Sequence, residues 1–181
     1  SEVARLAGPF MATAAWLRER KPELTVAVAL ASEPLGELFR SAAGDARMDA
    51  QLIPNRARDI MAAADVVLTA SGTASLEALL FKRPMVVAYR MVPLSYWLVR
   101  RLGLSRLPYF SLPNLLAGRQ IVPEFVQEQV RPEVLGPAVL AALDGSGLPP
   151  DWYDVCTAIH RQLRRDASTA AAREVLELIR K

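Results

Sequence analysis

The sequence has 181 residues, of which 52% are apolar and 23% are charged, and its formal net charge is +3. This balance is typical of a globular chain and excludes a largely disordered one, and the length is enough for one well-packed domain. No apolar run approaches the roughly 18 residues that a membrane-spanning helix needs. A single cysteine, Cys156, excludes an internal disulfide and fits a reducing compartment. Because the chain starts at Ser1 without an initiator methionine, we expect a trimmed domain or a fragment.

Helix and strand patterns alternate through the first part of the chain. Apolar residues at helical spacing predict a helix over 2–21 that Pro22 closes, and the continuous apolar run 24–30 predicts a strand buried on both faces. The same patterns predict further helices over 35–43, 59–64 and 76–82 and strands over 51–53, 66–69 and 84–89. Because strands and helices alternate at short spacing, the sequence predicts an α/β fold with a Rossmann-like, doubly wound parallel sheet.

The pattern changes in the last third of the chain. Helical spacing predicts a helix over 132–143, and the Gly- and Pro-rich run 144–150 predicts a linker or a tight corner. Residues 151–181 then carry an apolar stripe that predicts one long or broken amphipathic helix, formed by Trp152, Cys156, Ile159, Leu163, Ala167 and Ala170. We therefore expect a Rossmann-like domain over 1–143 and a helical extension over 144–181. The stripe is expected to pack against this domain, a further domain or a partner subunit.

A turn of small residues follows the predicted strand 66–69. Ser71, Gly72 and Thr73 stand where a helix begins, and a helix N-terminus presents unpaired N–H groups that suit a diphosphate. An ordinary helix cap is the commonest use of such residues and is the alternative. The turn lacks the GxxxxGK[ST], GxGxxG and GxSxG patterns, which argues against a P-loop, a dinucleotide oxidoreductase and a serine hydrolase.

Glu77 is the strongest single candidate for a ligand contact. Its helix is otherwise apolar, so a carboxylate there needs a reason. A capping box would need Ser or Thr three residues earlier, and that residue is Ala74. One turn beyond Gly72, the Glu77 carboxylate is placed to accept hydrogen bonds from sugar hydroxyls. A partly exposed position on the outer face of the helix is the alternative.

Ligands of open α/β sheets bind beyond the carboxyl ends of the strands. Here that rule predicts a site among residues 31–34, 54–58, 70–73, 90–93 and 112–119. Asn114 follows Pro113, so its amide suits either a helix start or a base edge or sugar hydroxyl. Arg90 and Arg119 are candidates, by position alone, for a cation that stabilises a leaving diphosphate. The only histidine is His160, and because no cluster of His or Cys accompanies it, we expect neither a metal site nor a catalytic histidine.

The stretch 82–119 carries basic residues and aromatic residues but no acidic ones. Such a mixture suits an anionic membrane surface or an anionic ligand, and a solvated basic face above core aromatics is the alternative. Nucleic acid is disfavoured because no recognised binding motif accompanies the charge. A helical segment over 92–102 is predicted to face lipid headgroups through Leu94, Trp97, Leu98, Arg100 and Arg101.

Two runs of the sequence carry a family resemblance, TASGTASLEALLFKRPMVVAYRM and SLPNLLAGRQIVPEF. They resemble the C-terminal half of bacterial lipid-A-disaccharide synthases, and SEVARLAGPF is similar to the helix that follows a GSR loop in that family. The resemblance covers nearly the whole chain and is most specific from Thr69 to Phe125. It implies the donor-binding half of a GT-B glycosyltransferase. Ser71 to Thr73 would lie near the diphosphate of UDP, Glu77 near the ribose and Asn114 at the nucleotide site.

The resemblance also implies a reaction and its setting. The donor would be UDP-2,3-diacylglucosamine and the acceptor 2,3-diacylglucosamine 1-phosphate, giving a β-1,6-linked disaccharide 1-phosphate and UDP without a metal or other cofactor. The acceptor site, the GSR loop and the general base would lie in an N-terminal half outside this chain, so we do not expect transfer by this chain alone. A peripheral enzyme at the cytoplasmic face of the inner membrane, forming a homodimer with exchanged C-terminal segments, is the family expectation.

Two other functions stay open at this point. A UDP-sugar 2-epimerase shares the GT-B plan but gives no use to the predicted lipid-facing stretch. A non-catalytic module for membrane surfaces would bind vesicles without any dependence on nucleotide.

Overall fold

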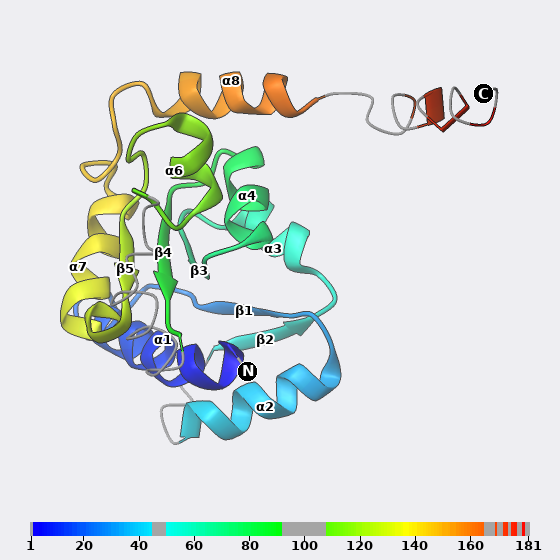
Figure 1. The fold of residues 1–181 in the computed structure, drawn as a ribbon. Coiled ribbons are helices and arrows are strands. Elements are labelled where there is room, and N and C mark those ends of the chain that lie inside the picture. The colour runs from blue at the N-terminus through cyan, green and yellow to red at the C-terminus, as the bar shows by residue number, and fades with distance from the viewer. Residues whose placement is uncertain are drawn as a thin grey trace, which may run out of the picture.

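A computed structural model of the chain describes residues 2–44, 50–91 and 108–164 (Figure 1). It also places separate residues of the C-terminal run, namely 169, 172, 173, 175, 176 and 179. The strands are β1 (Ala27–Leu30), β2 (Gln51–Pro54), β3 (Val67–Ala70), β4 (Met85–Tyr89) and β5 (Glu124–Val126). The helices are α1 (Glu2–Arg18), α2 (Glu33–Ala43), α3 (Ala57–Ala63), α4 (Thr73–Leu80), α6 (Leu112–Ala117), α7 (Pro132–Leu143) and α8 (Trp152–Leu163), and a 3-10 turn, η2, spans Gln127–Gln129.

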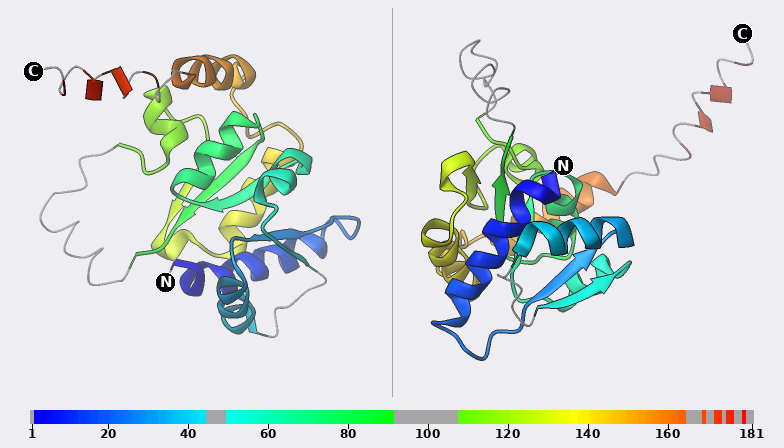
Figure 2. Two further views of the ribbon diagram at one scale, coloured as in Figure 1. Left: turned by 90° about the vertical axis from the view of Figure 1, so that its right-hand side faces the viewer. Right: turned by 90° about the horizontal axis from the view of Figure 1, so that it is seen from below.

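All strand pairs in the described part of the chain are parallel. β1 pairs with β2, and β3, β4 and β5 form a second sheet in that order. The prediction of an α/β fold with parallel strands and intervening helices is therefore confirmed. The described strands form two sheets where the sequence suggested one. β1, β2 and α2 lie at the end of the molecule away from α8 (Figures 1 and 2).

β4 is the strand on which both layers of helices pack. Side chains alternate across a strand, and the four residues Met85 to Ala88 are at most 1% exposed. Val86 and Ala88 join a cluster with apolar residues of α1 and α7, whereas Met85 and Val87 join one with residues of α4 and α8. This strand was predicted correctly from its continuous apolar run, and helices cover it on both faces.

α8 closes the second of these clusters. Trp152, Cys156 and Ile159 are buried on its inner face, and the Trp152 indole Nε1 donates to the Lys82 carbonyl at 3.4 Å. The predicted amphipathic stripe is thus buried within this domain over its first half. Leu163, at the end of α8, is 40% exposed. Ala167 and Ala170 lie outside the described residues, so the boundary between a domain over 1–143 and an extension over 144–181 stays a prediction.

The structure differs from the sequence predictions in one strand and in one run without predicted elements. β1 is shorter than 24–30 and is not buried on both faces, because Ala27 and Ala29 are exposed and β1 pairs only with β2 among the described strands. The run 111–125, for which no helix or strand bounds were predicted, forms α6 and β5. A six-residue helix and a three-residue strand are too short to show a clear period.

Candidate functional site

The turn of small residues lies at the carboxyl end of β3, as predicted. Gly72 precedes α4 with φ 138° and ψ −155°, a backbone conformation open to glycine and not to other residues. No side chain in the described part of the chain caps α4, so the N–H groups of its first turn stay available for an anion. Thr73 is exposed, and the Ser71 hydroxyl donates to the Phe110 carbonyl at 2.7 Å. Gly72 and Thr73 are thus open to a ligand, whereas Ser71 holds the start of the α6 segment.

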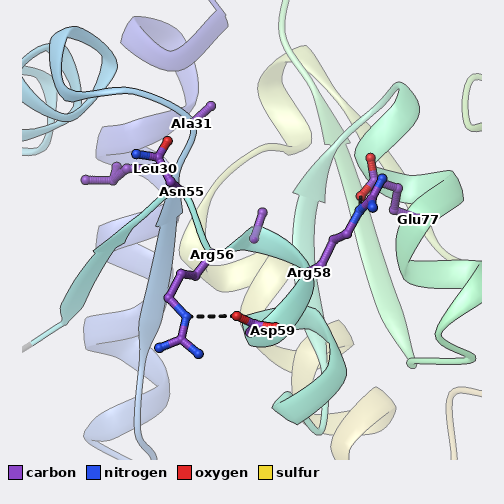
Figure 3. Close-up of a pocket in the computed structure, with 8 residues that line it drawn as sticks. Leu30, Ala31, Asn55, Arg56, Arg58, Asp59 and Glu77 are labelled. Carbon is purple, nitrogen blue, oxygen red and sulfur yellow. Dashed lines mark hydrogen bonds and ion pairs between the residues drawn. The ribbon is translucent and has the colours of Figure 1, made fainter.

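A groove of about 460 Å³ opens beside α4, at the carboxyl ends of β1 and β2 (Figure 3). Its lining residues come from the end of β1, the loop after β2, α3 and α4, and they are Leu30, Ala31, Asn55, Arg56, Ala57, Arg58, Asp59 and Glu77. Glu77 and Arg58 point toward one another across it, with 3.6 Å between Arg58 Nε and Glu77 Oε2. The structure therefore places Glu77 at a groove, one helical turn from the uncapped start of α4.

The loop after β2 was named from sequence only as a strand end, and its individual residues were not singled out. Asn55 adopts a left-handed conformation with φ 55°, and its N–H donates to the Leu30 carbonyl at 2.8 Å. This turn brings Arg56 and Arg58 to the groove. Arg56 pairs with Asp59 at 2.8 Å and Arg58 faces Glu77. In the sequence, only the two positive charges at 56 and 58, just after a predicted strand, could have indicated that these residues line a site.

Asn114 is placed close to the predicted region but is completely buried. Its Oδ1 accepts hydrogen bonds from the N–H groups of Ile121 and Val122 at 2.7 and 2.9 Å. Its Nδ2 donates to the Val122 carbonyl at 2.9 Å and to Glu124 Oε1 at 2.7 Å. A carboxamide offers two donors and two acceptor lone pairs, so these four bonds use the whole amide. In this structure the Asn114 side chain holds the segment before β5 and leaves nothing to offer a ligand.

Glu124 was not singled out from the sequence and is the acidic partner of α6. Its carboxylate accepts from the backbone N–H groups of Phe110 and Ser111, both at 2.8 Å. It also accepts from the Ser111 hydroxyl at 2.5 Å and from Asn114. An acidic side chain at a helix start is favoured by the helix dipole. The N-terminus of α6 is thus filled by a residue of the protein itself, unlike that of α4.

Arg90 and Arg119 lie in different surroundings. Arg90 follows β4, and its guanidinium donates to the carbonyls of Gln127 at 3.3 Å and Val130 at 2.9 Å. It is therefore at the predicted edge, where it joins β4 to the segment after β5. Its candidate role as a cation for a diphosphate has no direct support in these contacts.

Arg119 lies at the end of the sheet where β5 begins, whereas Gly72 lies at the opposite end, after the carboxyl end of β3. α6 begins beside Ser71, at the carboxyl end of β3, and runs back toward the segment that precedes β5, so that Arg119 reaches Asp151 at the start of α8. This hydrogen bond lowers the pKa of Asp151. The predicted segment 112–119 thus starts at the carboxyl end of β3, but α6 carries Arg119 away from it. Arg119 is not brought together with Glu77.

The remaining predicted residues add no group to the groove. His160 is exposed on α8 and does not line the groove. Among the described residues no helix is long and apolar enough to span a bilayer. The predicted membrane-facing residues Leu94, Trp97, Leu98, Arg100 and Arg101 lie outside the described part of the chain.

Parallel strands, helices on both faces of β4 and a groove at the carboxyl ends of β1 and β2 define a Rossmann-like α/β protein. Residues 1–175 match a family model described as Lipid-A-disaccharide synthetase. The chain therefore belongs to the lipid-A-disaccharide synthase family, whose members are glycosyltransferases.

Individual relatives agree with this assignment. The chain is 42% identical over 184 residues to a lipid-A-disaccharide synthase of Hahella chejuensis, covering 99% of this chain and 45% of the relative. It is 45% identical over 178 residues to one of Pseudomonas syringae pv. syringae, covering 98% and 46%. A third, from Azotobacter vinelandii, is 54% identical over 127 residues, covering 70% and 32%. The chain thus spans less than half the length of the relatives that it matches.

Proposed function

We propose that this chain is the donor-binding half of a lipid-A-disaccharide synthase and that it binds the UDP part of UDP-2,3-diacylglucosamine. The observation that carries the proposal is the groove that ends at Glu77, one turn from the uncapped N-terminus of α4. A diphosphate at Gly72 and Thr73 would accept hydrogen bonds from the free N–H groups, and the ribose would follow along α4 to Glu77. The nucleobase would then lie over the exposed backbone of the Asn55 turn.

The proposed reaction is a direct displacement at the anomeric carbon of the donor. The acceptor is 2,3-diacylglucosamine 1-phosphate, and the products are the β-1,6-linked disaccharide 1-phosphate and UDP. Negative charge grows on UDP as it leaves, and the N–H groups and dipole of α4 stabilise it without a metal. We propose that the acceptor site and the general base lie in the part of the relatives that this chain does not cover, and that this chain supplies donor binding and not the complete transfer.

The sugar-binding part of the proposal is tested by titrating UDP into the protein in a calorimeter, beside the Glu77→Ala variant. Loss of a carboxylate that accepts ribose hydroxyls is expected to weaken binding about tenfold or more. Glu37→Ala is the matched control, because Glu37 is an exposed glutamate on α2 outside the groove. Equal binding by the wild type and Glu77→Ala would remove Glu77 from the site. No UDP binding by the wild type would contradict the proposed function.

Two further proposals concern the setting of the protein. We propose that residues 92–102 contact an anionic membrane at the cytoplasmic face of the inner membrane, on the strength of their basic and aromatic sequence. We also propose that residues beyond α8 pair with a second copy through exchanged C-terminal segments. Val175, Leu176 and Ile179 support this, because they are apolar and at least 53% exposed.

A further inference from the structure

The carboxylate of Glu77 is almost unused by the protein. Within residues 2–44, 50–91 and 108–164 it accepts no hydrogen bond, and its side chain is 40% exposed at the groove. Its one charged contact is the Arg58 guanidinium, 3.6 Å away from Nε to Oε2. The other carboxylate oxygen, Oε1, has no partner among these residues. Glu77 is therefore held through one oxygen and open through the other.

Arg58 is placed to hold Glu77 rather than to complete the core. It lies in the first turn of α3, its side chain is 80% exposed, and Glu77 is its only ion-pair partner in the described part of the chain. Figure 3 shows the two side chains extending toward each other from α3 and α4. Because the contact joins two separate helices, it favours the orientation in which Oε2 of Glu77 points toward α3.

We infer that Arg58 is a positioning residue for ribose selection: by holding Oε2 of Glu77, it presents Oε1 to the 2′-hydroxyl of the bound nucleotide. This inference rests on the proposed function, in which Glu77 lies at the ribose. In Rossmann-like sites a carboxylate hydrogen-bonds the ribose 2′-hydroxyl, although there it lies about 20 residues beyond the glycine-rich turn and not within the next helical turn. A hydroxyl donates well to a charged and oriented oxygen, so selection depends on where the carboxylate points as well as on its charge.

The neighbouring arginine provides a comparison within the same groove. Arg56 also lines the groove, but its Nε binds Asp59 of its own helix at 2.8 Å. Removing Arg56 takes a positive charge from the groove without touching Glu77. A general electrostatic role for these arginines would make the two residues equivalent, whereas positioning of Glu77 belongs to Arg58 alone.

The experiment uses calorimetry to compare the affinities of the protein for UDP and for 2′-deoxy-UDP. The variants are Arg58→Gln, Arg58→Lys, Arg56→Gln and Glu77→Gln. We expect the wild type to prefer UDP and Arg58→Gln to lower that preference about two- to fivefold, the range for an exposed ion pair. Arg58→Lys restores part of the preference because it keeps the charge. Arg56→Gln keeps the wild-type preference, whatever its effect on affinity.

A double-mutant cycle completes the test. In the Glu77→Gln background, Arg58→Gln is expected to shift the preference no further, because the residue on which it acts is gone. An unchanged preference in Arg58→Gln, with both nucleotides weakened equally, would overturn the inference and place Arg58 on the phosphate or the base. Absence of UDP binding in the wild type would instead overturn the proposed function, so the two failures are distinguishable.

Discussion

Replacing Asn114 by alanine tests whether its amide supports the fold or contacts the nucleotide. Asn114 is 0% exposed, and the substitution removes the partners of three buried backbone groups, the N–H groups of Ile121 and Val122 and the Val122 carbonyl. Each buried group left without a partner costs about 1–3 kcal/mol, so even the low end gives about 3 kcal/mol for the three. For a chain of this size that lowers the melting temperature by about 6–12 °C.

The assay is urea unfolding followed by far-UV circular dichroism and tryptophan fluorescence, combined with UDP titration of the folded variant. Gln120→Ala is the control, because it removes an exposed amide from the same loop and is expected to change stability by about 0.5 kcal/mol or less. Asn114→Asp keeps both acceptors but places a carboxylate beside Glu124, and is expected to be at least as destabilising as the alanine. A stable Asn114→Ala protein that no longer binds UDP would refute this reasoning and place the amide on the nucleotide.

Two more predictions concern the buried cysteine and the proposed membrane contact. Burial raises the pKa of the Cys156 thiol to about 11, so at about pH 8 hardly any of it is the reactive thiolate. Ellman's reagent should therefore react slowly with the native protein and fully after unfolding in guanidinium chloride; rapid native reaction would mean that α8 opens readily. For the membrane proposal, replacing Trp97 and Leu98 together by serine should release the protein from vesicles of anionic lipid. Tyr153→Ser, at an exposed aromatic of α8, should leave partitioning unchanged.

The sequence predicted best those elements whose pattern is decided locally. The helix over 132–143 has the predicted bounds, because Pro132 opens it and a Gly-rich turn follows it. β4 was recognised by a run that is apolar at every position. The apolar run at β1 looked similar, yet the strand is half-exposed. The sequence shows that a strand is apolar, but the packing of the folded chain decides whether helices cover both of its faces.

The site was predicted in part for the same reason. The Gly72 turn and Glu77 follow one strand in sequence, so local spacing was enough to place them together at the start of α4. Arg58 reaches Glu77 from another helix, and no sequence pattern joins two residues that are adjacent only in the fold. Arg119 shows the converse. Its segment appeared to follow a strand, but α6 runs back across the sheet and carries it to the opposite edge, beside Asp151.

The unequal burial of the strands has a consequence for how the groove moves. β4 is at most 1% exposed over four residues, so its amides should exchange with solvent only when the whole domain unfolds. β1 and β2 consist mainly of exposed and half-buried residues, with Leu30 the one buried position, and they form a separate pair, so their hydrogen bonds should open at a lower free energy. The turn at Gly72 is thus anchored to the slowest-exchanging part of the molecule, and the Asn55 turn to a faster one. A nucleotide that contacts both turns would slow amide exchange mainly in β1 and β2, because the amides of β4 are already protected from exchange.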